Sequence, residues 1–358
     1  MKWEEFQALL SRIEPADRDW FVRAQSRQDH LTKPPGSLGR LEEIANRICG
    51  MQRTLEPQIE NPAILIFAAD NGVCEEGVNP FPQSVTRQMV ANFLADGAAI
   101  NALAGSVGAS LTVVDVGVLG EPLDHPMLVS RRTGPGTRNF SRGPAMSHEE
   151  VMAAVSAGVE IAGEAVRCGS TLLAVGEMGI GNSTVASAIC AAMTNSDPAT
   201  VCGRGTGSDE LGLARKREVV ARALALHREF LTTPLNLLAR LGGFEIAAMC
   251  GAYLRAAERR VPVIVDGFIS AAAAAIAVSM NDAVRDYLIA GHQSAEPGHV
   301  AFLRLLNLQP LLQLDMRLGE GTGAALAIPV VRAALAAFRS MKTFESAGVA
   351  ESTVSSFQ

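Results

Sequence analysis

The segment LLQLDMRLGEGTGAALA, residues 311–327, shows the pattern of apolar run, glycine-rich turn and helix that decides the fold. An apolar run at 311–314 leads into the turn Gly-Glu-Gly-Thr-Gly at 319–323, and an alanine-rich helical pattern follows. Glycine lets the backbone approach a ligand closely, and the free N–H groups of the following helix N-terminus attract an anion. Glu320 in this turn is either a residue stabilised by the helix dipole or a general base, and spacing alone favours the first slightly.

The same strand, turn and helix rhythm recurs along the chain. Short apolar runs predict further strands at 63–69, 111–116, 171–175, 262–265 and 287–290. Alanine-rich segments with helical spacing lie between several of them, at 84–103, 184–193 and 270–278. This alternation predicts an α/β fold in which helices cover both faces of a mostly parallel sheet.

Nearly every predicted strand ends in an acidic or glycine-bearing turn. These turns are residues 70–72, 115–117, 176–179, 266–267, 291–292 and 315–317. One such turn has an ordinary explanation, because Asp and Gly are common turn formers. Ligands of parallel sheets bind outside the carboxyl ends of the strands, so turns of this kind at one edge predict a shared pocket.

Two more glycine-rich loops favour a phosphate ligand. The loop GEMGIGNST at 176–184 lacks the G-x-G-x-x-G order of a dinucleotide fingerprint, and a phosphate cradle beside the carboxylate of Glu177 suits it better. The loop GRGTGSD at 203–209 precedes a charged helical stretch at 213–217. That stretch by itself is typical of a solvated helix face, but beside three glycine loops its Lys216 is also a candidate phosphate ligand.

The loop GHQSAEPGH at 291–299 has two interpretations. His292, Glu296 and His299 have the spacing of metal ligands on one helical face, but Pro297-Gly298 interrupts that helix. We therefore favour an oxyanion-binding loop that uses Ser294 and the backbone over a metal site.

Composition excludes several classes of protein. A chain of 358 residues with 48% hydrophobic content can bury a full core, and its net charge of -6 argues against a nucleic-acid partner. The six cysteines are scattered singly without C-x-x-C, which indicates neither a zinc site nor a disulfide framework. The most apolar run, 270–280, is shorter than the ~20 residues of a membrane span. We expect a cytoplasmic protein with no membrane partner.

The two ends of the chain carry helical patterns of their own. Apolar residues recur at helical spacing from Trp3 to Ile13, a second patch begins at Trp20, and a third pattern covers 324–341. We predict that residues 1–29 and 319–358 form a small helical domain beside a large α/β domain of residues 30–318.

Six motifs together resemble the nicotinate-nucleotide:dimethylbenzimidazole phosphoribosyltransferase family. They are KPPGSLGRLE, GEMGIGNST, CGRGTGSDELGLARK, VDGFISAAA, GHQSAEPGH and MRLGEGTGAALA, and the likeness extends from about residue 30 to residue 341. No single glycine loop is specific, but the combination in this order is. The resemblance implies a Rossmann-like parallel sheet flanked by helices, a small helical domain built from both chain termini, a homodimer, and no metal or redox cofactor.

The resemblance also implies substrates and site residues. The phosphoribosyl group of nicotinate mononucleotide would pass to 5,6-dimethylbenzimidazole or a related base, in the assembly of the cobalamin nucleotide loop. Glu320 would be the base, which reverses the preference from spacing, and Glu177 the second catalytic carboxylate. The phosphate would be held by Gly179, Lys216, Gly267 and Ser294 with Gly205 and Gly207, and the benzimidazole walls would be Phe81, Met178 and Leu318.

Two positions depart from the family pattern. Asn71 stands where the family often has the histidine of D-H-G, and Phe81 where some relatives have a hydroxyl-bearing residue. The second bears on which base is accepted, because it changes polarity and volume beside the ring. The alternatives are a dinucleotide-dependent oxidoreductase on the same fold and a non-catalytic nucleotide binder, since a fold by itself does not determine function.

Overall fold

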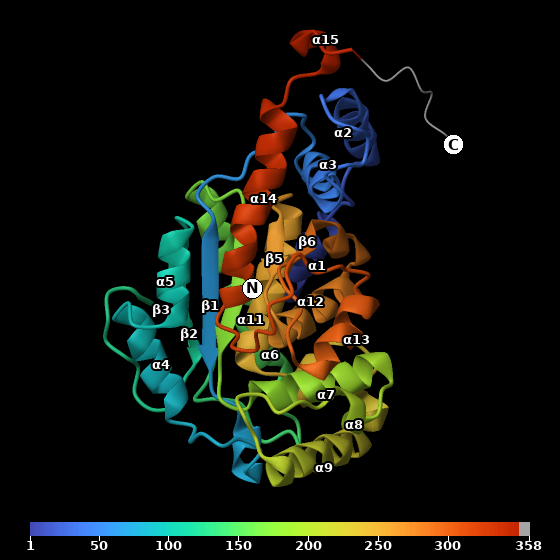
Figure 1. Ribbon diagram of the computed structural model, residues 1–358. Coiled ribbons are helices and arrows are strands. Elements are labelled where there is room, and N and C mark those ends of the chain that lie inside the picture. Colours follow the sequence, from blue (N-terminus) through green and yellow to red (C-terminus); the bar gives the residue numbers. More distant parts are fainter. Residues whose placement is uncertain (351–358) are drawn as a thin grey trace.

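The computed structural model describes residues 1–350 and has a six-stranded parallel sheet at its centre (Figure 1). The strands are β1 Ala63–Ala69, β2 Ser110–Gly117, β3 Leu128–Ser130, β4 Leu173–Met178, β5 Val263–Val265 and β6 Leu288–Ala290. Their order is β3-β2-β1-β4-β5-β6, and every neighbouring pair is parallel. This is the doubly wound order whose direction reverses beside β1, and it confirms the predicted α/β fold.

The helices cover both faces of this sheet. They are α1 Trp3–Ser11, α2 Arg18–His30, α3 Arg40–Gln52, α4 Val85–Leu94, α5 Ala99–Ser106, α6 His148–Arg167, α7 Asn182–Thr194, α8 Pro198–Val201, α9 Glu210–His227, α10 Pro234–Leu241, α11 Phe244–Glu258, α12 Phe268–Met280, α13 Pro297–Leu305, α14 Thr322–Ser340 and α15 Phe344–Ala347. Short 3-10 helices are η1 Gly72–Glu76, η2 Arg228–Phe230 and η3 Asp282–Tyr287. Because both faces are covered, all seven residues of β1 are buried, which explains its uninterrupted apolar sequence.

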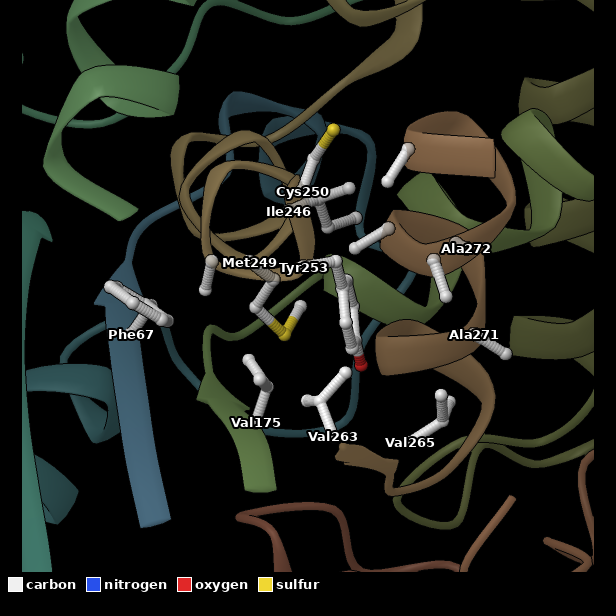
Figure 2. Packing of buried hydrophobic residues seen from close by; sticks show 14 of the residues in the cluster. Phe67, Val175, Ile246, Met249, Cys250, Tyr253, Val263, Val265, Ala271 and Ala272 are labelled. Atoms are coloured by element: carbon white, nitrogen blue, oxygen red, sulfur yellow. The ribbon is translucent and has the colours of Figure 1, made fainter. Parts of the chain in front are cut away.

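The core on one face is built by α11. Figure 2 shows Met249 and Tyr253 of this helix above Val175 of β4 and Val263 of β5. Tyr253 is fully buried, and its hydroxyl shares a hydrogen bond of 2.5 Å with Ser270 of α12. The polar end of this large side chain is therefore satisfied inside an apolar layer.

Helices α6 and α11 pack backbone to backbone. A Cβ atom on Gly158 would lie 1.7 Å from the Ala248 carbonyl oxygen, and one on Gly251 would lie 2.0 Å from the Val155 carbonyl oxygen. Glycine inside a helix costs about 0.5 to 1 kcal/mol relative to alanine. Here the close helix contact leaves room for no other residue.

Two sequence predictions are wrong. Residues 311–314 form no strand, because the chain there makes only a single parallel bridge, between His292 and Leu312, beyond the end of β6. The sixth strand is instead β3, which pairs with β2 at the opposite edge and has only three residues, too few to show a pattern. The predicted helix at 84–103 is divided into α4 and α5, since the chain turns at Asp96, where φ is +54°.

The terminal helices take different places in the fold. Helix α14 packs against β4, β5 and α5 along part of its length and against α3 farther on, while α1 packs against α11 (Figure 1). The division into a large domain and a small terminal domain stays a prediction, and residues 351–358 of that small domain lie outside the described residues.

Helix α14 is the one helix of the described chain long and apolar enough to cross a membrane. Its apolar window is 56% buried inside the protein. That burial, together with its contacts to two strands, is typical of a core helix.

Candidate active site

A pocket opens at the carboxyl end of β4, beside the point where the strand order reverses. Its walls come from the β4 to α7 turn, the 205–206 loop, the 317–320 turn and three single residues. The lining residues are Asn79, Glu177, Met178, Gly179, Ile180, Gly181, Asn182, Ser183, Gly205, Thr206, Ile269, Glu296, Arg317, Leu318 and Glu320. This is the place where doubly wound sheets bind their ligands.

Six of the eleven residues predicted for the site line this pocket. They are Glu177, Met178, Gly179, Gly205, Leu318 and Glu320. The structure therefore brings both predicted catalytic carboxylates together with some of the predicted phosphate-binding and base-binding residues.

The turn that carries Glu320 has an unusual backbone. Gly319, Glu320 and Gly321 all have positive φ, at +90°, +60° and +77°. Glutamate rarely adopts this conformation, which costs about 1 to 3 kcal/mol and persists mainly at functional sites. The turn also lies against β4, where a Cβ atom on Gly176 would come within 2.4 Å of the Gly321 nitrogen.

Asp266, at the end of β5, holds this turn in place. Its two carboxylate oxygens accept the Gly321 N–H at 3.1 Å and the Ala324 N–H at 2.9 Å, so it joins the β5 tail to the start of α14. Burial raises the pKa of Asp266, while His292 and these N–H groups oppose the rise. The sequence marked the 266–267 turn as part of the edge but gave no role to this side chain.

Glu320 lines the pocket at the end of this turn. Its side chain is buried, and Oε2 has no hydrogen-bond partner among the described residues. Burial, and then the negative charge of Asp266, raise its pKa to about 7. A general base works best when its pKa lies near the operating pH, so Glu320 is suited to accept a proton near neutrality.

Glu177 differs from Glu320 in both hydrogen bonding and protonation. The Asn182 side-chain amide donates to its carboxylate. Its pKa is raised to about 8, first by burial and then by Glu245, Asp266 and Glu320. Near neutral pH, Glu177 is therefore largely protonated.

Lys216 of α9 lies directly behind the pocket wall. It is fully buried, and its Nζ donates to Ser183 Oγ at 2.9 Å and to the Gly203 carbonyl at 3.1 Å. Gly205 closes over it with φ of +56°, where a Cβ atom would lie 3.3 Å from Nζ. The alternative of a solvated helix face does not hold for Lys216, because its ammonium group lies inside the protein against the pocket residues Ser183 and Gly205.

Gly267 and Ser294 border the same region without lining the pocket. A Cβ atom on Gly267 would lie 3.8 Å from Ser294 Cβ. Ser294 is buried, its N–H donates to His299 Nδ1 at 2.8 Å, and its hydroxyl accepts the Glu296 N–H at 3.3 Å. Burial, and then His292, lower the pKa of His299 to about 3, so this ring is a neutral acceptor.

Gly207 and Phe81 are not brought into the pocket. A Cβ atom on Gly207 would meet no atom within 4 Å, and Phe81 is 48% exposed. Their ligand-binding roles stay predictions.

Sequence reasoning missed several polar residues of the pocket. Arg317 donates to the Gly205 carbonyl at 3.0 Å, and Ser183 binds Lys216. The sequence pattern predicts no ligand-binding role for Ser183, and it offers Glu296 only as a ligand of the metal site that we do not favour. No local pattern identifies such residues, because their partners lie far away in the chain.

Asn71, the first departure from the family pattern, lies just behind the pocket. It is fully buried, and its side-chain amide donates to Glu245 Oε1 at 2.9 Å. A Cβ atom on Gly179 would lie 3.0 Å from the Asn71 amide nitrogen, so this pair supports the β4 to α7 turn. Burial raises the pKa of Glu245 to about 7, and the hydrogen bond from Asn71 opposes the rise.

A metal site is not formed by the residues that the structure describes. Residues 1–350 contain no group of three or more His, Cys, Asp or Glu side chains that could hold a metal ion. His299 instead uses Nδ1 to accept the Ser294 N–H. The loop at 291–299 is thus organised by internal hydrogen bonds.

The fold and the pocket define an α/β enzyme whose carboxylates and glycine loops suit a phosphorylated substrate. Comparison with known proteins places it more closely: the model of a family described as phosphoribosyltransferase matches residues 13–349, and the chain belongs to that family.

Similar proteins extend over nearly the whole chain. The nicotinate-nucleotide–dimethylbenzimidazole phosphoribosyltransferase of Chloroflexus aurantiacus is 51% identical over 345 residues, which are 96% of this chain and 98% of the relative. The protein of the same name from Thermus thermophilus is 50% identical over 93% of this chain and 99% of its own. The crystal structure of CobT from Thermus thermophilus matches with a TM-score of 0.90 and 49% identity, over 93% of this chain and all of that one.

Proposed function

We propose that this chain transfers the phosphoribosyl group of nicotinate mononucleotide to 5,6-dimethylbenzimidazole or a related base. The products are α-ribazole 5'-phosphate and nicotinate, and the reaction serves assembly of the cobalamin nucleotide loop. The observation that carries the proposal is the buried, unpartnered Glu320 carboxylate at the pocket wall, with a pKa of about 7. The names of relatives about half identical to this chain support the choice of substrates.

The chemistry requires one proton acceptor. The ring nitrogen of nicotinate in the donor is cationic, so the bond from C1 of the ribose to this nitrogen breaks with its electron pair returning to the ring. A benzimidazole nitrogen attacks C1 from the opposite face, which converts the β donor into an α product. The attacking nitrogen is the one without hydrogen; the N–H on the second ring nitrogen becomes acidic as positive charge develops, and Glu320 takes this proton.

The two carboxyls then have separate tasks. Glu177 is largely protonated near neutral pH, because its pKa is about 8, and it does not compete with Glu320 for the proton. Holding both rings on opposite faces of one ribose adds a proximity effect. Phosphate binding falls to Lys216 with the backbone of the glycine loops, because a phosphate needs charged donors as well as N–H groups.

Location and assembly are part of the same proposal. A reducing cytoplasm suits the six cysteines, which are all free. A homodimer suits the pocket, because Leu318 lies in its wall and is nevertheless 51% exposed. Sedimentation analysis of the purified chain tests the dimer directly.

The decisive experiment is incubation with nicotinate mononucleotide and a panel of bases, with products resolved by mass. We expect nicotinate and a ribazole phosphate, with one base preferred. Binding of nucleotide without turnover would favour the non-catalytic binder. Quenching of protein fluorescence by NAD, with reduction of the cofactor, would favour the oxidoreductase.

A further inference from the structure

Glu296 is a carboxylate in the part of the pocket where an anion is expected to bind. It lines the pocket, is 6% exposed and immediately precedes α13. Its backbone is fixed on both sides, since its N–H donates to Ser294 Oγ and its carbonyl accepts the His299 N–H at 3.0 Å. The side chain therefore projects from a rigid loop.

The carboxylate of Glu296 bridges two loops far apart in the sequence. Oε1 accepts the N–H of Gly205 at 2.9 Å, across 91 positions of the chain. Oε2 is buried and has no hydrogen-bond partner among the described residues. Space for it is provided by Gly203, where a Cβ atom would lie 2.2 Å from Oε2.

The same two glycines surround the ammonium group of Lys216. Nζ donates to the Gly203 carbonyl, and Gly205 lies above Nζ and above Ser183 Oγ, which accepts the second Lys216 bond. A buried carboxylate with one oxygen unpartnered and a buried ammonium are each costly alone. Their placement around one glycine loop reduces both costs.

We propose that Glu296 is a positioning residue, which clamps the Gly203–Gly207 loop onto Lys216 and keeps that ammonium ready for the phosphate monoester of the donor nucleotide. This inference rests on the proposed function. It gives a role to a conspicuous carboxylate that phosphate binding by itself would disfavour.

The charges around Lys216 support this role. Burial lowers the pKa of Lys216, and the influences that oppose the fall are Glu296 first and the Cys202 thiol second. Ser183 of α7 faces Nζ as a neutral hydrogen-bond acceptor. Removal of the Glu296 charge therefore favours loss of the Lys216 proton, and a lysine loses its proton as pH rises.

The first test is Glu296→Gln, which keeps the shape and an acceptor for Gly205 but removes the charge. We expect the nucleotide KM to rise about tenfold near pH 7 and further near pH 8.5, while kcat and the KM of the base change less than about twofold. The matched control is Glu218→Gln on the same helix as Lys216, where the side chain is 77% exposed and should leave all constants unchanged.

A second variant moves the carboxylate without removing it. Gly203→Ala places a Cβ atom against Glu296 Oε2, so it should also raise the nucleotide KM if the position of this group matters. Thermal midpoints of all variants show whether each is folded. This variant keeps the test open if Glu296→Gln does not fold.

A double variant at Glu296 and Lys216 distinguishes a positioning role of Glu296 from a general structural effect. We expect the Lys216→Met, Glu296→Gln double variant to have the nucleotide KM of Lys216→Met alone, because Glu296 acts through the ammonium group. Three outcomes would overturn the inference. The effects of the two substitutions on the nucleotide KM could multiply in the double variant, or the nucleotide KM of Glu296→Gln could stay unchanged or fall. The third outcome is that Glu296→Gln impairs kcat and the KM values of both substrates to the same extent.

Failure of the proposed function gives a different result. The wild-type protein would then produce no ribazole phosphate from any base. Calorimetric titration with inorganic phosphate would still test Glu296, with weaker binding expected in Glu296→Gln than in the wild type. Equal phosphate binding by both proteins would overturn the role of Glu296.

Discussion

Glycines serve two opposite purposes in the α6–α11 contact and in the carboxyl edge of the sheet. At the helix contact, Gly158 and Gly251 bring two backbones together inside an apolar layer. At the edge, Gly176 and Gly319 make room for a turn with positive φ and for the Glu177 carboxylate.

The two regions differ in what their close backbone contacts do for the protein. The helix contact buries apolar surface, which stabilises the fold. The edge holds a glutamate with positive φ, carboxyls with raised pKa values and an unpartnered oxygen, all of which cost stability. Features that oppose stability persist where they serve chemistry, and this contrast marks the edge as the functional region.

The largest effect is expected from a side chain added at the helix contact. Gly158→Val places Cβ against the Ala248 carbonyl, a backbone atom that cannot move aside alone, so we expect a loss of about 3 kcal/mol in the free energy of unfolding. Urea denaturation measures it, and the folded protein should keep both KM values. Gly105→Ala in α5 is the control, since its Cβ meets no atom within 4 Å and should stabilise by about 0.5 to 1 kcal/mol. Equal effects of the two variants would contradict the packing argument.

Loss of the proton acceptor is expected to act on rate and not on stability. Glu320→Gln should lower kcat by about 10²-fold, or about 2.7 kcal/mol in the activation barrier, because the amide cannot accept the proton. Substrate KM values should change little, and the thermal midpoint should not fall. A nearly normal kcat would move the base role to Glu177, provided that Glu177→Gln then proved inactive.

A substitution on the phosphate side of the pocket is expected to act mainly on the KM of the nucleotide. Lys216→Met keeps the buried aliphatic stem and removes the charge, so we expect the nucleotide KM to rise about tenfold, with a smaller change in kcat. Initial rates over a range of nucleotide concentrations measure it. Unchanged constants for both substrates would remove Lys216 from the site.

The last effect is a gradual one and concerns the pH dependence of stability. Glu177 has a folded pKa of about 8, above the unfolded value near 4.5, so the folded protein binds more protons between these pH values. Stability should therefore fall as pH rises from about 5 to about 8, and Glu320 and Glu245 add to this fall through their raised pKa values. Glu177→Gln should flatten the slope of the thermal midpoint over this range. An identical slope in both proteins would show that Glu177 is not protonated in the folded state.

The sequence alone determined the fold class and the centre of the site. Continuous apolar runs such as 63–69 mark strands covered on both faces, and the glycines around Glu177 and Glu320 mark turns that follow them. These are local patterns, and the carboxyl ends of parallel strands necessarily share one edge. The family resemblance assigned roles to the six predicted residues that line the pocket, of which Glu177 and Glu320 were already candidates from the local pattern.

Only the tertiary structure decided which partners these residues have and how their pKa values are shifted. The short strand β3 and the single bridge at Leu312 depend on neighbours in space, so the sequence missed the first and misassigned the second. The bond between Glu296 and Gly205 joins residues 91 positions apart, and no spacing rule predicts it. The raised pKa of Glu177 likewise depends on burial and on Glu245, because electrostatic energy depends on distance and solvent exposure in the folded protein.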